Sequence, residues 1–245
     1  MTQDTLYKKL LHNIEDFQFD ASVSAVFDDM VDRSVPGYRT LIANIGPLAR
    51  HFMQTHSRCY DLGCSHGAAA LAVFNHCKIE GLEIIAVDNA SAMIDRCAEL
   101  VSQHNAQNIV STLCDDIQNI TITNASMVIL NLTLQFVAIQ QRQKVLQNIY
   151  AGLNANGVCL ITEKIVMPDQ AQEDLLQTLH TGFKSANNYS DLEISQKRKS
   201  LENVLLRESL DTHIERLSEV GFSQIIPWFQ SVSYTHLTLP TKASV

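Results

Sequence analysis

The sequence predicts an α/β fold with a mostly parallel central sheet and helices on both faces. From residue 58 to about 162, short apolar runs of strand length alternate with segments whose apolar residues recur at helical spacing. A turn that contains Gly63 and Gly67 joins the first run to an alanine-rich helix candidate. Strands and helices that alternate at this spacing indicate a parallel sheet.

The first half of this region contains two strand candidates and two helix candidates. RCYDL (58–62) and EIIAVD (83–88) have the apolar character of buried strands, and AAALAVFNHC (68–77) is rich in helix formers. Ser91 is a candidate N-cap for the helix after the second strand. Apolar residues of that helix recur at i, i+3, i+4 and i+7, namely Ile94, Cys97, Ala98 and Val101.

The second half completes a core of residues 57–163. Its apolar patterns predict, in chain order, the strands IVSTLC (109–114) and SMVILN (126–131), the helix KVLQNIYAGL (144–153), a turn at Asn156-Gly157 and the strand VCLITE (158–163).

Both ends of the chain differ from this core, and we expect them to belong to the same single Rossmann-like domain, residues 1–245. Residues 1–56 are predicted to form a mainly helical N-terminal cap, broken at Val35-Pro36-Gly37. Residues 164–220 are predicted to form a helical insertion before the last strands.

Residues 221–245 are predicted to hold the terminal strands and an atypical tail. GFSQIIPWFQ (221–230) is a strand candidate, and Pro227 places it near a sheet edge. SVSYTHLTLPTKASV (231–245) lacks the apolar run of a buried strand. It is either an edge strand with a tail or sequence foreign to the native protein, and no function is assigned to it.

Composition and charge exclude some classes of function. The net charge of −8 argues against direct nucleic-acid binding, because the contacts that neutralise phosphate are missing. No apolar run approaches the roughly 18 residues that span a bilayer. Since the N-terminus also lacks the layout of a secretory signal, we expect a cytoplasmic protein without membrane contact.

The cysteines and histidines do not predict a metal site. No pair of the six cysteines has the CxxC spacing, so we interpret all six as reduced thiols without a metal. His66, His180 and His213 have no metal-ligand spacing either, and we interpret them as structural or exposed.

Polar groups follow four successive predicted strands at their carboxyl ends, which is the edge where open parallel sheets bind ligands. They are Gly63, Cys64 and Ser65 after the first strand, Asp88 and Asn89 after the second, Asp115, Asp116 and then Ile117 after the third, and Asn131 after the fourth.

Each of these groups has a structural explanation beside a functional one. The glycines could serve only a turn with positive φ, and Asp88 could cap the helix near Ser91. Asp88 could instead accept both ribose hydroxyls of a nucleoside. Asp115-Asp116 could be a solvated loop, or accept an adenine amino group while Ile117 packs on the ring. Asn131 could only end its strand or line a reaction pocket.

The glycine spacing decides between nucleotide classes. G-x-x-x-G differs from the G-x-G-x-x-G of dinucleotide sites, and no GK[ST] of a P-loop follows. Ribose and adenine contacts without a diphosphate cradle favour S-adenosyl-L-methionine over NAD. Asp61-Leu62-Gly63-Cys64-Ser65-His66-Gly67 resembles the first motif of class I S-adenosylmethionine-dependent methyltransferases, D-x-G-x-G-x-G, with Ser65 in place of the central glycine. This resemblance implies that Asp61 holds the amino group of the methionine part.

Further stretches resemble one narrower family, the carboxy-S-adenosyl-L-methionine synthases of bacterial tRNA wobble-uridine modification. They are RSVPGY (33–38), YDLGCS (60–65), NASMVILNLTLQF (124–136), NIYAGLNANG (148–157) and YSDLEISQKRKSLENV (189–204). The resemblance runs from about residue 17 to 230, and the tail after Gln230 departs from it.

The resemblance implies a reaction, a product and a partner. S-adenosyl-L-methionine and prephenate would give carboxy-S-adenosyl-L-methionine, phenylpyruvate and water, and a second enzyme would transfer the carboxymethyl group to tRNA. The implied binding residues are Tyr38, Gly63, Cys64, Ser65, Asp88, Asn89, Asp116, Ile117, Asn131 and Arg198. Arg198 would grip the new carboxylate bidentately and act catalytically, in a site that involves a homodimer. Two alternatives stay open: an ordinary small-molecule methyltransferase and a non-catalytic cofactor-binding subunit.

Overall fold

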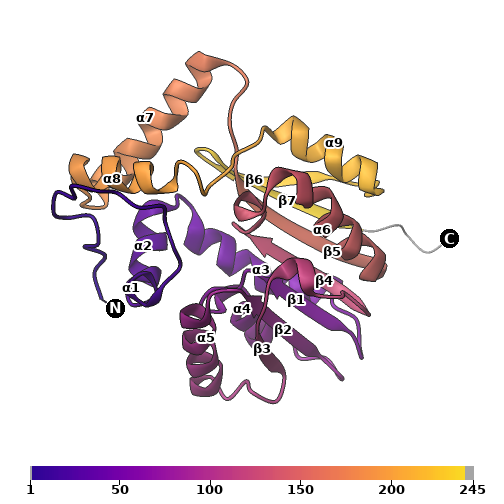
Figure 1. Cartoon of the computed structure of the whole chain (residues 1–245). Coiled ribbons are helices and arrows are strands. Elements are labelled where there is room, and N and C mark those ends of the chain that lie inside the picture. Colours follow the sequence, from indigo (N-terminus) through magenta and orange to yellow (C-terminus); the bar gives the residue numbers. More distant parts are fainter. Residues whose placement is uncertain (1, 241–245) are drawn as a thin grey trace.

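A seven-stranded sheet forms the centre of the computed structural model, which describes residues 2–240 (Figure 1). The strand order is β3-β2-β1-β4-β5-β7-β6. The first five strands in that order are parallel, and β7 runs antiparallel to both of its neighbours. The strands are β1 (Arg58–Leu62), β2 (Glu83–Asp88), β3 (Val110–Cys114), β4 (Ala125–Asn131), β5 (Leu153–Lys164), β6 (Ile226–Ser231) and β7 (Tyr234–Pro240). The predicted mostly parallel sheet is confirmed.

Helices cover both faces of the sheet, as predicted. One face packs against α3 (Tyr38–Phe52), α4 (Ala68–His76) and α5 (Ser91–Gln103). The other face packs against α6 (Ile139–Gly152) and α9 (Leu210–Val220). Within residues 2–240, no helix is both long enough and apolar enough to cross a membrane.

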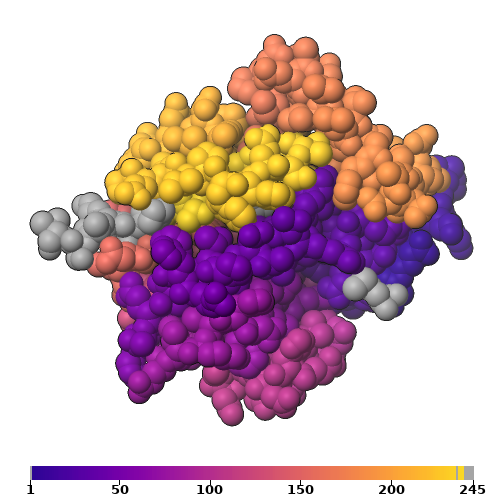
Figure 2. Space-filling view, turned by 180° about the vertical axis from the view of Figure 1, so that it is seen from behind, coloured from indigo at the N-terminus to yellow at the C-terminus, as the bar shows by residue number. Residues whose placement is uncertain are grey.

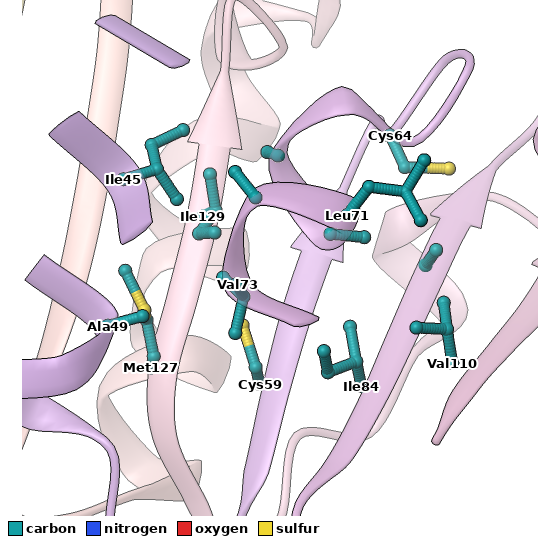
Figure 3. Close-up of a cluster of buried hydrophobic side chains, with 14 of the residues drawn as sticks. Ile45, Ala49, Cys59, Cys64, Leu71, Val73, Ile84, Val110, Met127 and Ile129 are labelled. Carbon is teal, nitrogen blue, oxygen red and sulfur yellow. The ribbon is translucent and has the colours of Figure 1, made fainter. Parts of the chain in front are cut away.

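Successive residues of a central strand alternate between the two apolar cores. Met127 and Ile129 of β4 belong to the core under α3 and α4, whereas Val128 and Leu130 belong to the core under α6. This alternation follows from the two-residue period of a strand. Figure 3 shows part of the first core, where Ile129 lies near Ile45 of α3 and Met127 lies near Ala49 of the same helix. Two buried faces explain why the central strands are continuous apolar runs.

The predicted helical N-terminal cap is only partly present. Residues 2–20 form no helix, and the first helices are α1 (Ala21–Ser24) and α2 (Phe27–Ser34). The backbone of this segment bonds instead to α8 (Asp191–Leu201): Leu11 N donates to the Gln196 side chain at 2.7 Å and Phe17 N to Ser200 O at 2.9 Å. Tertiary contacts thus replace the i to i−4 bonds that a helix would make. The predicted break before α3 is confirmed, since Gly37 has a φ of 81°.

The helical insertion is present between β5 and β6. It contains α7 (Gln170–Ala186), α8 and α9, and α7 projects away from the sheet (Figure 1). Ser190 and Glu193 form a capping box that starts α8. On the opposite face of the molecule, the violet segment that contains α3 borders the yellow C-terminal strands (Figure 2), where Phe229 and Ser231 lie against Gly37.

The C-terminal strands correct one prediction and confirm another. β6, which contains Pro227, is the edge strand, as its proline indicates. The stretch after residue 230 is not an edge strand, because β7 lies inside the sheet between β5 and β6. Leu237 and Leu239 supply enough apolar side chain to be buried there. Residues 241–245 of the predicted tail lie outside the described residues.

β7 is nevertheless poorly matched to its buried position. The hydroxyls of Thr235 and Thr238, and that of Ser233 just before the strand, are buried without a hydrogen-bond partner among the described residues. An unsatisfied buried hydroxyl costs about 1–3 kcal/mol. An apolar residue at each position would remove that cost.

Two local predictions were wrong in detail. Ser91 is the first residue of α5 and not its cap, because the N-cap is Ala90 and no side chain caps that helix. The turn expected at Asn156-Gly157 lies within β5, as a bulge opposite the register shift between Ala125 and Met127. Asn156 has a φ of 60°, which an asparagine adopts more readily than most residues and which lets the strand continue.

Candidate functional site

A cavity of about 270 Å³ opens at the carboxyl ends of the parallel strands. Every predicted binding residue except Arg198 lines it: Tyr38, Gly63, Cys64, Ser65, Asp88, Asn89, Asp116, Ile117 and Asn131. The tips of four strands therefore converge on one space, at the edge where open α/β sheets bind ligands.

The glycine turn borders the cavity and has a backbone conformation that few residues adopt. Gly63 has a φ of +77°, and a Cβ there would collide with the side chain of Thr133. Ser65 also adopts a left-handed conformation, with a φ of 48°. This conformation explains why a glycine suits the central position of the motif, and why Ser65 carries some backbone strain.

Asp88 fixes this loop to the tip of β2. One carboxylate oxygen accepts from Ser65 N at 2.9 Å, and the other accepts from Ala90 N at 3.0 Å. Burial raises the pKa of this carboxyl, against the lowering effect of the bond from Ala90 N. Because each carboxylate oxygen has two acceptor sites, both retain one for a ribose hydroxyl.

Asp61 presents an unsatisfied charge to the cavity. Its side chain is 1% exposed, and Oδ2 accepts from Ala70 N at 3.0 Å. Oδ1 is buried with no hydrogen-bond partner in the described chain, and burial raises the pKa of the carboxyl to about 7. Asn131 Oδ1 is buried and unpartnered in the same way. Two such acceptors fit the ammonium group of an amino-acid ligand such as S-adenosyl-L-methionine.

Asp116 and Ile117 lie at the third strand tip as predicted. Asp116 accepts from Gln118 N at 2.8 Å and so caps a 3₁₀ turn, Ile117–Asn119. Ile117 is buried and contributes apolar surface to the cavity. A carboxylate beside an aliphatic wall suits an adenine ring, which needs an acceptor at its amino group and an apolar face.

Four aromatic rings that were not predicted from the sequence form one wall of the cavity. Phe19 lies edge-on to Phe17, Phe27 and Phe136, with centroid distances of 5.1, 6.5 and 5.2 Å, and all four rings line the cavity. Phe17 and Phe19 are two residues apart, which is the spacing of one face of an extended segment. That spacing was the available signal, and it was obscured by the prediction of a helical cap.

A second group that was not predicted from the sequence is a lysine cluster, which consists of Lys164, His180, Lys184 and Lys197. All four side chains line the cavity. Lys197 is 6% exposed, whereas the adjacent Arg198 is exposed. The triplet 197–199 is therefore not one solvated face of α8, since successive residues of a helix point about 100° apart. His180 is buried, 3% exposed, and His66 and His213 are buried as well.

Arg198 lies outside the cavity in a single chain. Its guanidinium approaches Thr181 Oγ1 of α7 at 3.5 Å. Its role in gripping a carboxylate remains a prediction, and an exposed position suits an arginine that acts on a neighbouring subunit. In residues 2–240, no cluster of three or more His, Cys, Asp or Glu residues could hold a metal ion.

Comparison with known sequences adds independent information. A family model described as "Methyltransferase domain" matches residues 60–157. A carboxy-S-adenosyl-L-methionine synthase from Pasteurella multocida is 48% identical over 234 residues, which are 96% of this chain and 97% of that protein. A protein of the same name from Trichlorobacter lovleyi is 51% identical over 235 residues, 96% of each chain.

Solved structures share the fold at much lower identity. An O-methyltransferase family protein from Burkholderia thailandensis superimposes with a TM-score of 0.66 and 15% identity, covering 93% of this chain and 62% of that one. Human N-acetylserotonin methyltransferase, solved in complex with S-adenosyl-L-methionine, gives a TM-score of 0.58 and 15% identity, with 91% and 56% covered. The chain thus spans less than two thirds of those two proteins.

Proposed function

Because the chain belongs to the family of carboxy-S-adenosyl-L-methionine synthases, we propose that it makes this product with prephenate as the donor of the carboxyl group. The predicted class I methyltransferase fold is confirmed by the sequence family and the structural neighbours. One observation carries the proposal: the residues predicted to bind the adenosyl group and a buried lysine cluster line the same cavity. An ordinary methyltransferase does not need those cations, because it transfers a methyl group and not a carboxylate.

The reaction depends more on holding the two substrates next to each other than on a strong protein nucleophile. The sulfonium makes the methyl C–H bonds of S-adenosyl-L-methionine acidic. Prephenate loses carbon dioxide and its ring hydroxyl as it becomes aromatic phenylpyruvate. The methyl carbon loses a proton and forms the new C–C bond to that carbon dioxide, and the proton and hydroxide give water. Holding both substrates in one closed space keeps the carbon dioxide next to the carbon that captures it.

The side chains that line the cavity divide the work of binding S-adenosyl-L-methionine. Asp88 accepts the ribose hydroxyls, and Asp116 with Ile117 holds the adenine. The orphaned Asp61 Oδ1 accepts from the amino group, which places the sulfonium near the end of β4. The aromatic rings of the N-terminal segment exclude water from the end of the cavity that would hold the sulfonium.

Arg198 is proposed to bind the carboxylate of the product from a partner subunit. Replacing Arg198 with alanine is expected to weaken binding of carboxy-S-adenosyl-L-methionine about 10- to 100-fold, because a charge-assisted pair is lost. Binding of S-adenosyl-L-methionine should change little, since that molecule lacks the carboxylate. Titration calorimetry with both compounds measures the difference, and Lys199→Ala is the matched exposed control. Equal losses for both compounds would contradict this role.

The homodimer that this role requires is proposed to form through the helical insertion. Leu175 and Leu179 of α7 are 58% and 50% exposed, and they are four residues apart on one face of the helix. Replacing both with lysine is expected to convert a dimer into a monomer with reduced synthase activity, because two apolar anchors become charged. Light scattering measures the mass, and Leu113→Lys on β3 is the control. A wild-type monomer, or a variant with the wild-type mass, would refute this interface.

The product is proposed to serve a second enzyme of the cytoplasm, which transfers the carboxymethyl group to wobble uridine in tRNA. The net charge of −8 gives this chain little attraction for nucleic acid itself, which supports a division between making the group and transferring it.

The experiment that tests the proposed function is a product assay without partner proteins. The purified chain is incubated with S-adenosyl-L-methionine and prephenate, and the nucleosides are analysed by mass spectrometry. We expect a nucleoside with one carboxyl group in place of one hydrogen, together with phenylpyruvate. If the folded protein binds S-adenosyl-L-methionine and no such product forms, the proposal is wrong.

A further inference from the structure

The lysine cluster brings basic groups from three separate elements to one wall of the cavity. Lys164 is the last residue of β5, His180 and Lys184 come from α7, and Lys197 comes from α8. β5 is parallel to β4, and Thr162 pairs with Asn131. Lys164 therefore extends the row of strand tips to a fifth strand, next to β4, and it lines the same cavity as Asn131.

The hydrogen bonds inside the cluster leave its positive charge largely unpaired. His180 Nε2 lies 2.9 Å from Ser34 O, and since a carbonyl only accepts, this nitrogen carries the proton. Nδ1 is then free to accept from Lys164 Nζ at 3.4 Å. The ring is neutral, since burial lowers the pKa of His180 to about 3. His180 thus positions Lys164 without neutralising it.

The other two lysines differ in the number of their partners. Lys197 Nζ donates to Ser34 Oγ at 3.4 Å and lies 3.8 Å from the carboxylate of Asp4. Lys184 is 9% exposed, and in the described part of the chain its ammonium makes neither a hydrogen bond nor an ion pair. Three ammonium groups thus share one carboxylate within ion-pair distance. When all three lysines are protonated, the cluster therefore has about two more positive charges than negative charges.

Burial keeps the cluster only partly charged in the free protein. It lowers the pKa of Lys164 to about 7, that of Lys184 to about 8 and that of Lys197 to about 7. The other charged groups that act on these lysines come from every neighbouring element: Asp4, Asp29, Arg33, Glu173, Arg198 and Arg207. They are three carboxylates and three arginines, so their charges balance and the surroundings add no net negative charge.

We propose that the lysine cluster binds the carboxylate groups of the carboxyl donor, a small organic dianion, and holds it against the methyl group of S-adenosyl-L-methionine. This inference rests on the proposed function, since it assigns a place to the second substrate of that reaction. The excess of about two positive charges in the fully protonated cluster matches a dianion. The ammonium of Lys184 has no protein partner in the described chain that would compete with a carboxylate of the donor. Lys184 is therefore the main recognition residue of the three.

Protonation should accompany the binding of this dianion. A bound carboxylate favours the ammonium form and raises the pKa of each lysine that it contacts. Lysines that are partly neutral between pH 7 and 8 must then take up protons. Donor affinity should accordingly fall as the pH rises above about 8, where the free cluster has lost its charge.

The test separates donor binding from turnover. The protein is loaded with S-adenosyl-L-homocysteine, which lacks the methyl group, and titrated with prephenate in a calorimeter at pH 7.5, a value chosen within about half a unit of the lysine pKa values. Buffers of different ionisation enthalpy report the protons taken up. We expect net uptake in the wild type, and about 10- to 100-fold weaker donor binding with less uptake in Lys184→Met.

Two controls keep the result specific. Lys144→Met removes a lysine from the exposed surface of α6 and should leave donor binding unchanged. Lys184→Met should bind S-adenosyl-L-methionine within about 2-fold of the wild type, which shows that the fold and the adenosyl site are intact. Because no hydrogen bond of Lys184 Nζ is lost, this variant is better suited than Lys197→Met, which removes the partner of Ser34 and Asp4.

The outcomes distinguish this inference from the proposed function. Donor binding and proton uptake that are unchanged in Lys184→Met would overturn the inference, even if the wild type makes the carboxylated product. Weaker binding of carboxy-S-adenosyl-L-methionine with unchanged donor binding would also overturn it, because the cluster would then serve the product. Lysine-dependent binding of prephenate without any carboxylated product would support the site and refute the proposed reaction.

Discussion

Replacing Asp88 with alanine is expected to weaken binding of both S-adenosyl-L-methionine and carboxy-S-adenosyl-L-methionine by about 100-fold or more. Each hydrogen bond from a ribose hydroxyl to a carboxylate is worth about 1.5–3 kcal/mol, and two would be lost. The same carboxylate accepts from Ser65 N and Ala90 N, so the glycine loop also loses its link to β2. The loss should be equal for the two compounds, because ribose is common to both.

Calorimetric titration measures this effect directly. Asp95→Ala is a suitable control, since Asp95 is an exposed carboxylate on the neighbouring helix α5 and does not line the cavity. Circular dichroism before the titration shows whether the variant is folded. Wild-type affinity in folded Asp88→Ala would remove Asp88 from the site, and a loss confined to the carboxylated compound would contradict its assignment to ribose.

Replacing Arg142 with methionine is expected to destabilise the fold by about 3–5 kcal/mol, the range for breaking a buried charge network. Arg142 is 0% exposed. It donates to Val137 O at 3.0 Å, to Leu206 O at 2.7 Å and to Gln135 O at 3.3 Å, and it is paired with Glu208. This one side chain thus joins α6, the loop after β4 and the segment before α9.

The free energy of unfolding, measured by urea denaturation, tests this prediction. Methionine retains much of the buried volume, so the loss reports on the polar network and not on a large cavity. Arg96→Met removes an arginine that is paired with Glu99 on the exposed surface of α5, and it should cost less than about 1 kcal/mol. A change in Arg142→Met as small as that of the control would show that the network does not hold these segments together.

The parallel half of the fold could be predicted from the sequence because its signal is local. Strands buried on both faces are apolar along most of their length, and in Ala125–Asn131 only Ser126 and the terminal Asn131 are polar. The carboxyl end of each strand is then the place for polar ligand contacts, which is how Asp88 and Asn131 were found. Those inferences needed only the order of elements along the chain.

The remaining site residues could not be predicted because their roles depend on distant packing. Lys197 and Arg198 are adjacent in sequence, and only the docking of α8 decides which of them points into the cavity. Phe17 and Phe19 reach the cavity because the N-terminal segment bonds to α8 instead of to itself. β7 lies between β5 and β6 although its hydroxyls fit that place poorly, so its own sequence did not indicate a strand inside the sheet.

We assert that one cavity orients the sulfonium between the carboxylates at the strand tips and the lysine cluster. A crystal structure of the protein with S-adenosyl-L-methionine bound is the most direct test. We expect the ribose at Asp88, the amino group at Asp61 and the methyl carbon turned toward Lys164 and Lys184. A nucleoside seated elsewhere, or a methyl group that points away from those lysines, would contradict the assertion.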